Sequence, residues 1–186
     1  MGEIMSNESF HNPDQHMSAL RTIIAGGRKR IGLLLGAGAS AGMKKNDGTY
    51  PLIPAVAGLT DQVLGVLDPE FGKQILALKK ELSPKDDIET ILSRIRSLAR
   101  VIGPAKIHDL DGPGYERFSA RICDEIGKIV NVSLPDTGSA YEDIVTWIVG
   151  TNRDHPVEVF TTNYDLLMEE ALERVRAPYF DGFTGG

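Results

Sequence analysis

The sequence is poor in cysteine, in long hydrophobic runs and in excess positive charge. Its single cysteine, Cys123, excludes an internal disulfide bond and a zinc site built from several cysteines, and we interpret it as a small buried hydrophobic residue in a reducing compartment. No apolar run approaches the ~18 residues that a membrane-spanning helix needs. Lys and Arg number 20 against 26 Asp and Glu, a net charge of −6, which disfavours tight nucleic-acid binding by this chain. We therefore expect a cytoplasmic protein outside the membrane.

The remaining composition is typical of one globular domain. Hydrophobic residues make up 41% and charged residues 25% of the 186 residues, close to the average for soluble proteins, so an intrinsically disordered chain is excluded. The first residues are polar and without hydrophobic periodicity, whereas residues 16–25 carry apolar side chains at helical spacing. We expect a flexible tail over residues 1–15 and a single domain over residues 16–186.

Two short apolar segments predict a parallel β-sheet. Residues 31–35 (IGLLL) and 156–162 (PVEVFTT) are continuous apolar or β-branched runs, typical of strands buried on both faces of a sheet. A third strand is expected to begin at 177–180, and a helix is expected from about 164 to 176. The sequence thus predicts an α/β fold whose sheet is incomplete at the C-terminus.

Helical periodicity dominates the long segment between the first two predicted strands. Turn signals rich in glycine and proline divide it into separate elements. Helices are predicted at about 56–67, 70–82, 87–102, 115–131 and 139–149. We therefore expect a helical insertion over residues 55–150.

A glycine-rich segment, Gly36-Ala37-Gly38-Ala39-Ser40-Ala41-Gly42, directly follows the first predicted strand. A strand that leads through such a turn into a helix can hold a phosphate group with its backbone N–H groups. The spacing differs from the dinucleotide fingerprint, and no strand ending in an acidic residue follows about twenty residues later, which disfavours an ordinary dehydrogenase. The alternative is a tight turn packed against a neighbouring helix.

A polar segment, Thr161-Thr162-Asn163-Tyr164-Asp165, follows the second predicted strand. Ligands of open α/β sheets bind at the carboxyl ends of the strands, so the glycine-rich and polar segments should face one crevice. The alternative is that Thr162 or Asn163 caps the next helix and that Asp165 complements its dipole.

Taken together, these segments resemble a known family. Residues 36–40 are similar to the GAGxS loop of sirtuins, and residues 162–165 resemble the sirtuin Gln-Asn-Ile-Asp segment. Over about residues 30–186 the chain is similar to sirtuin-like NADase domains of bacterial antiphage defence systems, including those paired with a HerA-type ATPase. The similar segments are GLLLGAGASAGM, PLIPAVAGLTDQV, IETILSRI, VEVFTTNYDLLMEEAL and YFDGFTGG.

The resemblance implies a Rossmann-like domain that hydrolyses NAD to nicotinamide and ADP-ribose as a toxic effector in antiphage defence. It further implies a homo-oligomer, NAD as the substrate and no metal. Asn163 would orient a ribose hydroxyl or the attacking water, and Asp165 would hold the ribose side of the site; both are the candidate catalytic residues. The candidate NAD-binding residues are Gly36, Ala37, Gly38, Ala39 and Ser40, which would hold the pyrophosphate, together with Thr162, Asn163 and Asp165.

Two other functions stay open at this point. NAD-dependent deacylation is disfavoured, because Pro54-Ala55-Val56-Ala57 replaces the Pro-Asp-Phe-Arg run of deacylating sirtuins and residues 180–183 lack their histidine. The other alternative is a catalytically silent subunit that binds NAD or ADP-ribose and gates a partner ATPase.

The histidines and the single tryptophan are not assigned to the site. His11, His16, His108 and His155 are interpreted as surface residues, and Trp147 and Tyr141 as core or subunit interface. Defence-type relatives place their catalytic histidine at a position that would lie beyond Gly186. We therefore expect residues 1–186 alone to be inactive.

Overall fold

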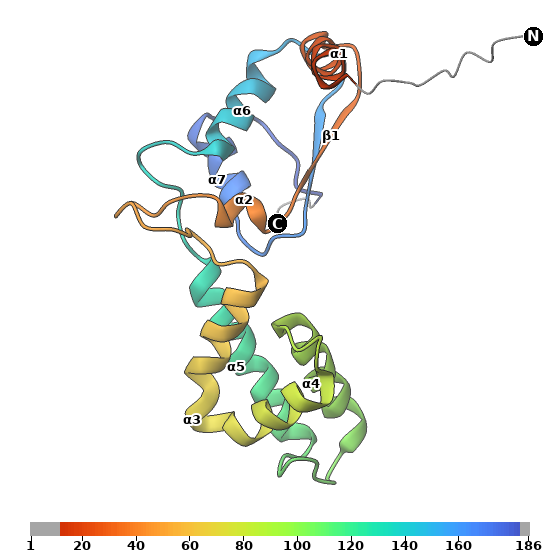
Figure 1. Cartoon of the computed structure of the whole chain (residues 1–186), viewed down its shortest axis with the longest axis vertical. Helices are drawn as coiled ribbons and strands as arrows, with labels where there is room; N and C mark the ends of the chain where they lie inside the picture. The colour runs from red at the N-terminus through yellow and green to blue at the C-terminus, as the bar shows by residue number, and fades with distance from the viewer. Residues whose placement is uncertain (1–11, 183–186) are drawn as a thin grey trace, which may run out of the picture.

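The computed structural model describes residues 12–182, which form a mixed α/β structure in two lobes (Figure 1). The sheet lobe contains both strands with α1, α2, α6 and α7, and the helical lobe contains α3, α4 and α5. In chain order the elements are α1 (Pro13–Ala25), β1 (Ile31–Leu35), α2 (Gly38–Ala41), α3 (Val56–Leu82), α4 (Ile88–Ile102), α5 (Gly112–Val130), α6 (Ala140–Gly150), β2 (Val157–Thr161) and α7 (Leu167–Arg174).

The two predicted strands pair in parallel, in a register that runs from Ile31 opposite Val157 to Leu35 opposite Thr161. The expectation that both faces of this sheet are buried is wrong. Leu35 and Val159 pack against a core formed with α6 and α7, but Leu34 and Phe160 on the other face are 76% and 56% exposed. Among residues 12–182 no helix covers that second face.

The chain after α7 is irregular, so the third strand expected at 177–180 is not formed among the described residues. Pro178 has no N–H group to donate to a ladder, and Phe180 is 76% exposed. Helix α7 is also shorter than expected at its start, because residues 162–166 form a loop.

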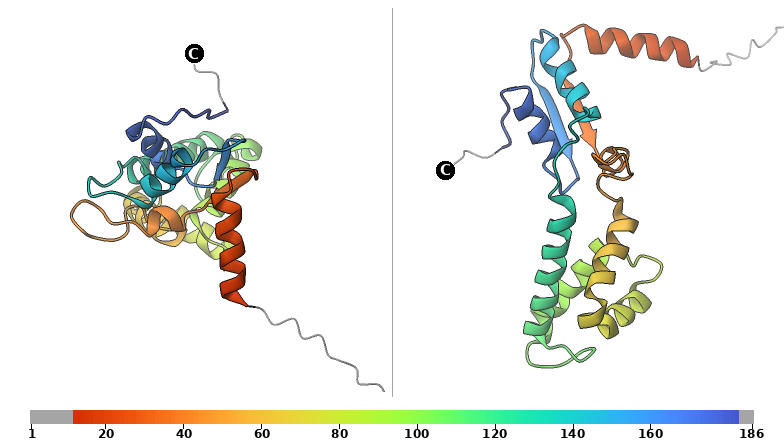
Figure 2. Two further views of the ribbon diagram at one scale, coloured as in Figure 1. Left: turned by 90° about the horizontal axis from the view of Figure 1, so that it is seen from above. Right: turned by 90° about the vertical axis from the view of Figure 1, so that its left-hand side faces the viewer.

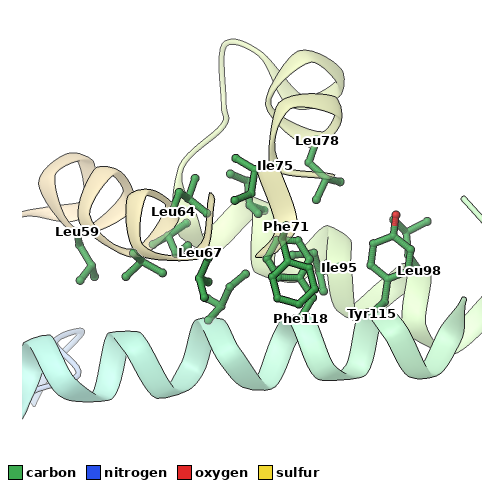
Figure 3. Packing of buried hydrophobic residues seen from close by; sticks show 14 residues of the cluster. Leu59, Leu64, Leu67, Phe71, Ile75, Leu78, Ile95, Leu98, Tyr115 and Phe118 are labelled. Carbon is green, nitrogen blue, oxygen red and sulfur yellow. The ribbon is translucent and has the colours of Figure 1, made fainter. Parts of the chain in front are cut away.

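The helical lobe contains the larger hydrophobic core of the described chain (Figure 3). Helices α3, α4 and α5 pack their apolar stripes together, and the rings of Phe71 and Phe118 stack with centroids 4.2 Å apart. The two helices predicted at 56–67 and 70–82 form one element with a kink at Phe71, two residues after Pro69. A proline inside a helix removes one hydrogen bond and bends the axis, which explains the break in the sequence pattern.

Two further expectations about exposed elements are corrected. Helix α1 begins at Pro13, because the Asn12 side chain accepts hydrogen bonds from the backbone of Asp14 and Gln15, so residues 12–15 are not a tail. Residues 1–11 lie outside the described part.

Cys123 is exposed on α5, where Arg96 Nη2 donates to its Sγ atom at 3.3 Å, and is not a buried hydrophobic residue.

Helix α1 projects from the sheet lobe, away from the remaining elements (Figure 2), and none of its residues is buried. Of the helices between residues 12 and 182, none combines the length and the hydropathy needed to cross a membrane.

Candidate functional site

The glycine-rich segment leaves β1 and forms the short helix α2. Ala39 N donates to Gly36 O at 2.9 Å, which closes the turn. A Cβ atom on Gly36 or Gly38 would meet no atom within 4 Å, and neither residue has a positive φ. Neither the backbone conformation nor packing among the described residues therefore requires glycine at these two positions. The alternative of a turn packed against a neighbouring helix does not account for them, and the space above the turn is open.

The polar segment begins where β2 ends. Thr162 N still donates to Leu35 O at 3.1 Å, and Asn163 N then donates to Thr161 Oγ1 at 3.0 Å, which turns the chain out of the sheet. The capping alternative holds in part for Asp165, whose Oδ1 accepts from Leu167 N at 3.3 Å. It does not hold for Thr162 or Asn163, because the N-cap residue of α7 is Leu166, whose own side chain makes no capping hydrogen bond.

The structure brings the glycine-rich and polar segments together, as the strand-end argument predicted. Ser40 is 2% exposed, and its hydroxyl donates to Asp165 Oδ2 at 2.6 Å across a sequence separation of 125 residues. Asn163 Nδ2 lies 3.3 Å from Ser40 Oγ and 3.3 Å from the hydroxyl oxygen of Tyr141. One hydrogen-bonded group therefore joins the ends of both strands to α6.

The direction of these hydrogen bonds fixes the orientation of the Asn163 amide. The Asp165 carboxylate can only accept, so the single Ser40 hydroxyl hydrogen points to it. Ser40 Oγ therefore accepts from its other neighbours, and it requires the NH₂ group of Asn163 rather than the amide oxygen. This places Oδ1 of Asn163 away from Ser40. That oxygen is buried and has no hydrogen-bond partner among the described residues.

A cavity of about 300 Å³ lies beside this group, at the junction of the two lobes. Its polar side comes from the strand ends and its apolar side from the segments that lead into and out of the helical lobe. Its carboxylates are Asp165 and Glu89, and no lysine, arginine or histidine belongs to its lining within residues 12–182. The lining residues are Ala37, Ser40, Ile53, Pro54, Val56, Leu59, Glu89, Val130, Thr162, Asn163, Tyr164 and Asp165.

Two tyrosines keep their hydroxyl hydrogens at this site. Burial raises the pKa of Tyr141 above its usual value. Burial and the hydrogen bond that the Tyr164 hydroxyl donates to Glu89 at 3.1 Å raise the pKa of Tyr164 in the same direction. Both phenols are therefore neutral hydrogen-bond donors at physiological pH. The Tyr164–Glu89 bond also connects the start of α4 in the helical lobe to the loop after β2.

The predicted site residues divide into two groups. Ala37, Ser40, Thr162, Asn163 and Asp165 line the cavity, whereas Gly36, Gly38 and Ala39 belong to the same turn but do not line it.

Sequence reasoning missed two residues at the site. Tyr141 is buried in the sheet-lobe core, as expected, but its hydroxyl also reaches the site. Glu89 lies in the first turn of α4, where an acidic side chain also complements the helix dipole. The only signal for Tyr141 is a hydroxyl-bearing ring on an otherwise apolar helix face, and nothing in the sequence indicates that Glu89 lies near residues 162–165.

The described histidines lie elsewhere. His155 lines a separate small hollow with Arg30 and Glu158, at the start of β2 and thus at the opposite end of the strand from Asn163. His108 is in the helical lobe beside the Tyr115 hydroxyl at 3.2 Å, and His16 is on α1. His11 lies outside the described residues.

Comparison of the sequence with protein-family models and with curated proteins gives no match. A function for this chain is therefore inferred from the geometry of the site and from the resemblance of its two segments to sirtuins.

Proposed function

We propose that the chain is a sirtuin-like NADase with a Rossmann-like domain interrupted by a helical insertion. It hydrolyses NAD to nicotinamide and ADP-ribose. The observation that carries the proposal is Asn163, which lines a cavity at the carboxyl ends of two parallel strands and whose buried Oδ1 atom lacks a donor among the described residues. An unpaired buried amide oxygen costs about 1–3 kcal/mol, so a bound hydroxyl group or water molecule would stabilise it.

The lining of the cavity suits the nicotinamide end of NAD. Its apolar wall, which includes Ile53, Val56 and Val130, is suited to a flat ring. The carboxylates of Asp165 and Glu89, without a neighbouring cation in the lining, favour a positively charged ring such as the pyridinium of NAD. A cavity of about 300 Å³ accommodates one end of the dinucleotide. The pyrophosphate would then lie over the turn at Gly36 and Gly38, where space is open.

The proposed reaction needs little acid catalysis, because the positively charged pyridinium ring of NAD becomes neutral nicotinamide when it leaves the ribose. The bond between ribose C1′ and the ring nitrogen breaks with its electron pair on nitrogen, and positive charge develops on the ribose. Asn163 Oδ1 would accept a hydrogen bond from a ribose hydroxyl or the attacking water, and the negative charge of Asp165 would stabilise the ribose cation. Water oxygen then bonds to C1′, and the proton that it loses passes to solvent.

By the same resemblance we propose that the protein acts as a homo-oligomer in antiphage defence, in the cytoplasm and with a HerA-type ATPase as partner. A subunit that binds NAD or ADP-ribose without cleaving it is the second candidate. It is favoured by the absence of a histidine from the cavity lining within residues 12–182.

The test measures nicotinamide release from NAD by the native polypeptide, expressed from its own gene with the neighbouring genes. Asn163→Ala should lower the release rate by at least about a hundredfold, the cost of removing one positioned polar group from an active site. Asn152→Ala changes an exposed asparagine outside the cavity and should leave the rate unchanged. Circular dichroism confirms that both variants fold.

The outcomes separate the two candidates. Release at the wild-type rate by a folded Asn163→Ala protein would remove Asn163 from the mechanism. If the wild-type protein binds ADP-ribose in calorimetry but releases no nicotinamide, the binding subunit is the correct function.

A further inference from the structure

Tyr141 carries a hydroxyl group that core packing does not explain. Its side chain is 2% exposed and belongs to the core of the sheet lobe. Within residues 12–182, its hydroxyl makes hydrogen bonds only with Asn163 Nδ2 at 3.3 Å and Ser40 Oγ at 3.4 Å. A phenylalanine would fill the same space without the free-energy cost of burying a hydroxyl. The hydroxyl therefore acts on the site rather than on the packing.

The hydroxyl completes the set of contacts that orients Asn163. Asp165 directs the Ser40 hydrogen, and Ser40 in turn requires the Asn163 amide nitrogen on its side. One contact of 3.3 Å leaves the amide free to pivot about it. A second contact from Tyr141, on a different element, restricts that rotation.

Helix α6 holds Tyr141 firmly in this place. The Ser139 side chain caps α6 by accepting from Glu142 N at 3.2 Å. Arg174 of α7 donates to Glu142 of α6 at 3.1 Å and to Glu170 at 2.8 Å. The Arg174–Glu142 bond joins α7 to α6, and the loop that precedes α7 carries Asn163. The distance between Tyr141 and Asn163 is thus set by the packing of two helices.

We propose that Tyr141 is a positioning residue for Asn163: its hydroxyl holds the amide nitrogen on the Ser40 side and so leaves Oδ1 as the atom that meets the substrate. This inference rests on the proposed function, in which Asn163 acts through Oδ1. It assigns to the helical insertion a direct part in the site, through α6, in addition to the cavity wall.

The kinetic test compares two changes of the same chemistry. Tyr141→Phe removes the hydroxyl and keeps the ring. Tyr115→Phe is the matched control, because Tyr115 is fully buried and its hydroxyl donates to Ile107 O at 3.1 Å in the helical lobe. For nicotinamide release, Tyr141→Phe should lower kcat about tenfold with KM within about twofold, as expected when a group that orients a catalytic residue is lost. Tyr115→Phe should leave kcat unchanged.

A second measurement does not depend on catalysis. In the ¹⁵N-labelled chain, the side-chain amide signals of Asn163 are identified by their absence from Asn163→Ala. Their hydrogen exchange with solvent should be at least about fivefold faster in Tyr141→Phe than in the wild-type protein and in Tyr115→Phe. The amide spectrum also reports whether each variant is folded.

The two measurements separate the inference from the proposed function. If the wild-type protein releases no nicotinamide, the proposed function fails, and faster amide exchange in Tyr141→Phe still supports the positioning role. Unchanged exchange in a folded Tyr141→Phe protein overturns the inference. Equal losses of kcat in Tyr141→Phe and Tyr115→Phe overturn it as well, because the effect would then be a general loss of stability.

Discussion

The helical lobe and the sheet lobe differ in how completely they cover their hydrophobic side chains. In the helical lobe, three helices surround a continuous core in which Phe118 is fully buried. In the sheet lobe, α6 and α7 cover one face of two strands, and the other face leaves Phe160 56% exposed. The hydrogen-bonded group of Ser40, Asn163 and Asp165 belongs to the sheet lobe. The difference suggests that one lobe provides most of the stability and the other provides most of the polar groups of the site.

The comparison is tested most strongly by two phenylalanines. Phe118→Ala should lower the free energy of unfolding by about 3–5 kcal/mol, because it opens a cavity beside Phe71. Phe160→Ala should change it by less than about 1 kcal/mol, because the exposed ring contributes little buried area. Urea denaturation measures both values. Equal losses of unfolding free energy in the two variants would show that the open sheet face is covered in solution. The two lobes would then bury their hydrophobic side chains to a similar extent.

The next test concerns the site in the sheet lobe. Gly38→Val should weaken ADP-ribose binding by at least about tenfold, or about 1.4 kcal/mol, because its side chain would fill the open space above the turn. Calorimetry measures the affinity. Gly65→Val in α3 is the control, since a Cβ there also meets no atom within 4 Å and lies outside the cavity lining. Undiminished affinity in Gly38→Val would mean that the turn has no role in binding.

The smallest expected effect is in the helical lobe, at the start of α4. Asp87 accepts from Thr90 N at 2.9 Å, and this hydrogen bond lowers the pKa of Asp87. A group whose pKa is lowered in the folded state stabilises the protein at pH values above its unfolded-state pKa, which is about 3.9 for aspartate. This stabilisation disappears as the pH falls through the folded-state pKa. Asp87→Ala should therefore cost about 1 kcal/mol at pH 7, and the difference from the wild-type protein should shrink as the pH falls below about 3.9.

Urea denaturation at a series of pH values gives this difference directly. Asp61→Ala, which changes an exposed aspartate in the second turn of α3, should have little effect at any pH. A cost for Asp87→Ala that is the same at pH 7 and pH 2 would exclude the carboxylate as the source of the capping energy.

The sequence predicted the individual helices and strands better than the way in which they pack against one another. The apolar runs at 31–35 and 156–162 identified both strands, and the stripe at 87–102 identified α4, because hydrophobic spacing is a local property. The same runs wrongly predicted a sheet buried on both faces, since no local pattern records which elements pack on a strand. At 177–180, hydrophobic residues were read as a strand although Pro178 cannot donate to a ladder.

The candidate site was predicted in part for a related reason. Chain topology places the carboxyl ends of parallel strands together, so the meeting of Ser40 with Asp165 followed from two local patterns. Tyr141 and Glu89 reach the site through the packing of α6 and through the junction of the two lobes. Such contacts depend on the tertiary arrangement, and no spacing in the sequence encodes them.

The pairing of residue 31 with residue 157 also affects how the protein is made. The helices of the helical lobe contact one another over short sequence distances and can fold early, whereas the parallel pair must close a loop that contains that entire lobe. Ser40 and Asp165 lie on opposite sides of this loop, and their hydrogen bond can form only after it closes. During synthesis, the polar group therefore cannot assemble until the chain has left the ribosome beyond Asp165. An unfinished chain is consequently inert toward any ligand that requires both strand ends.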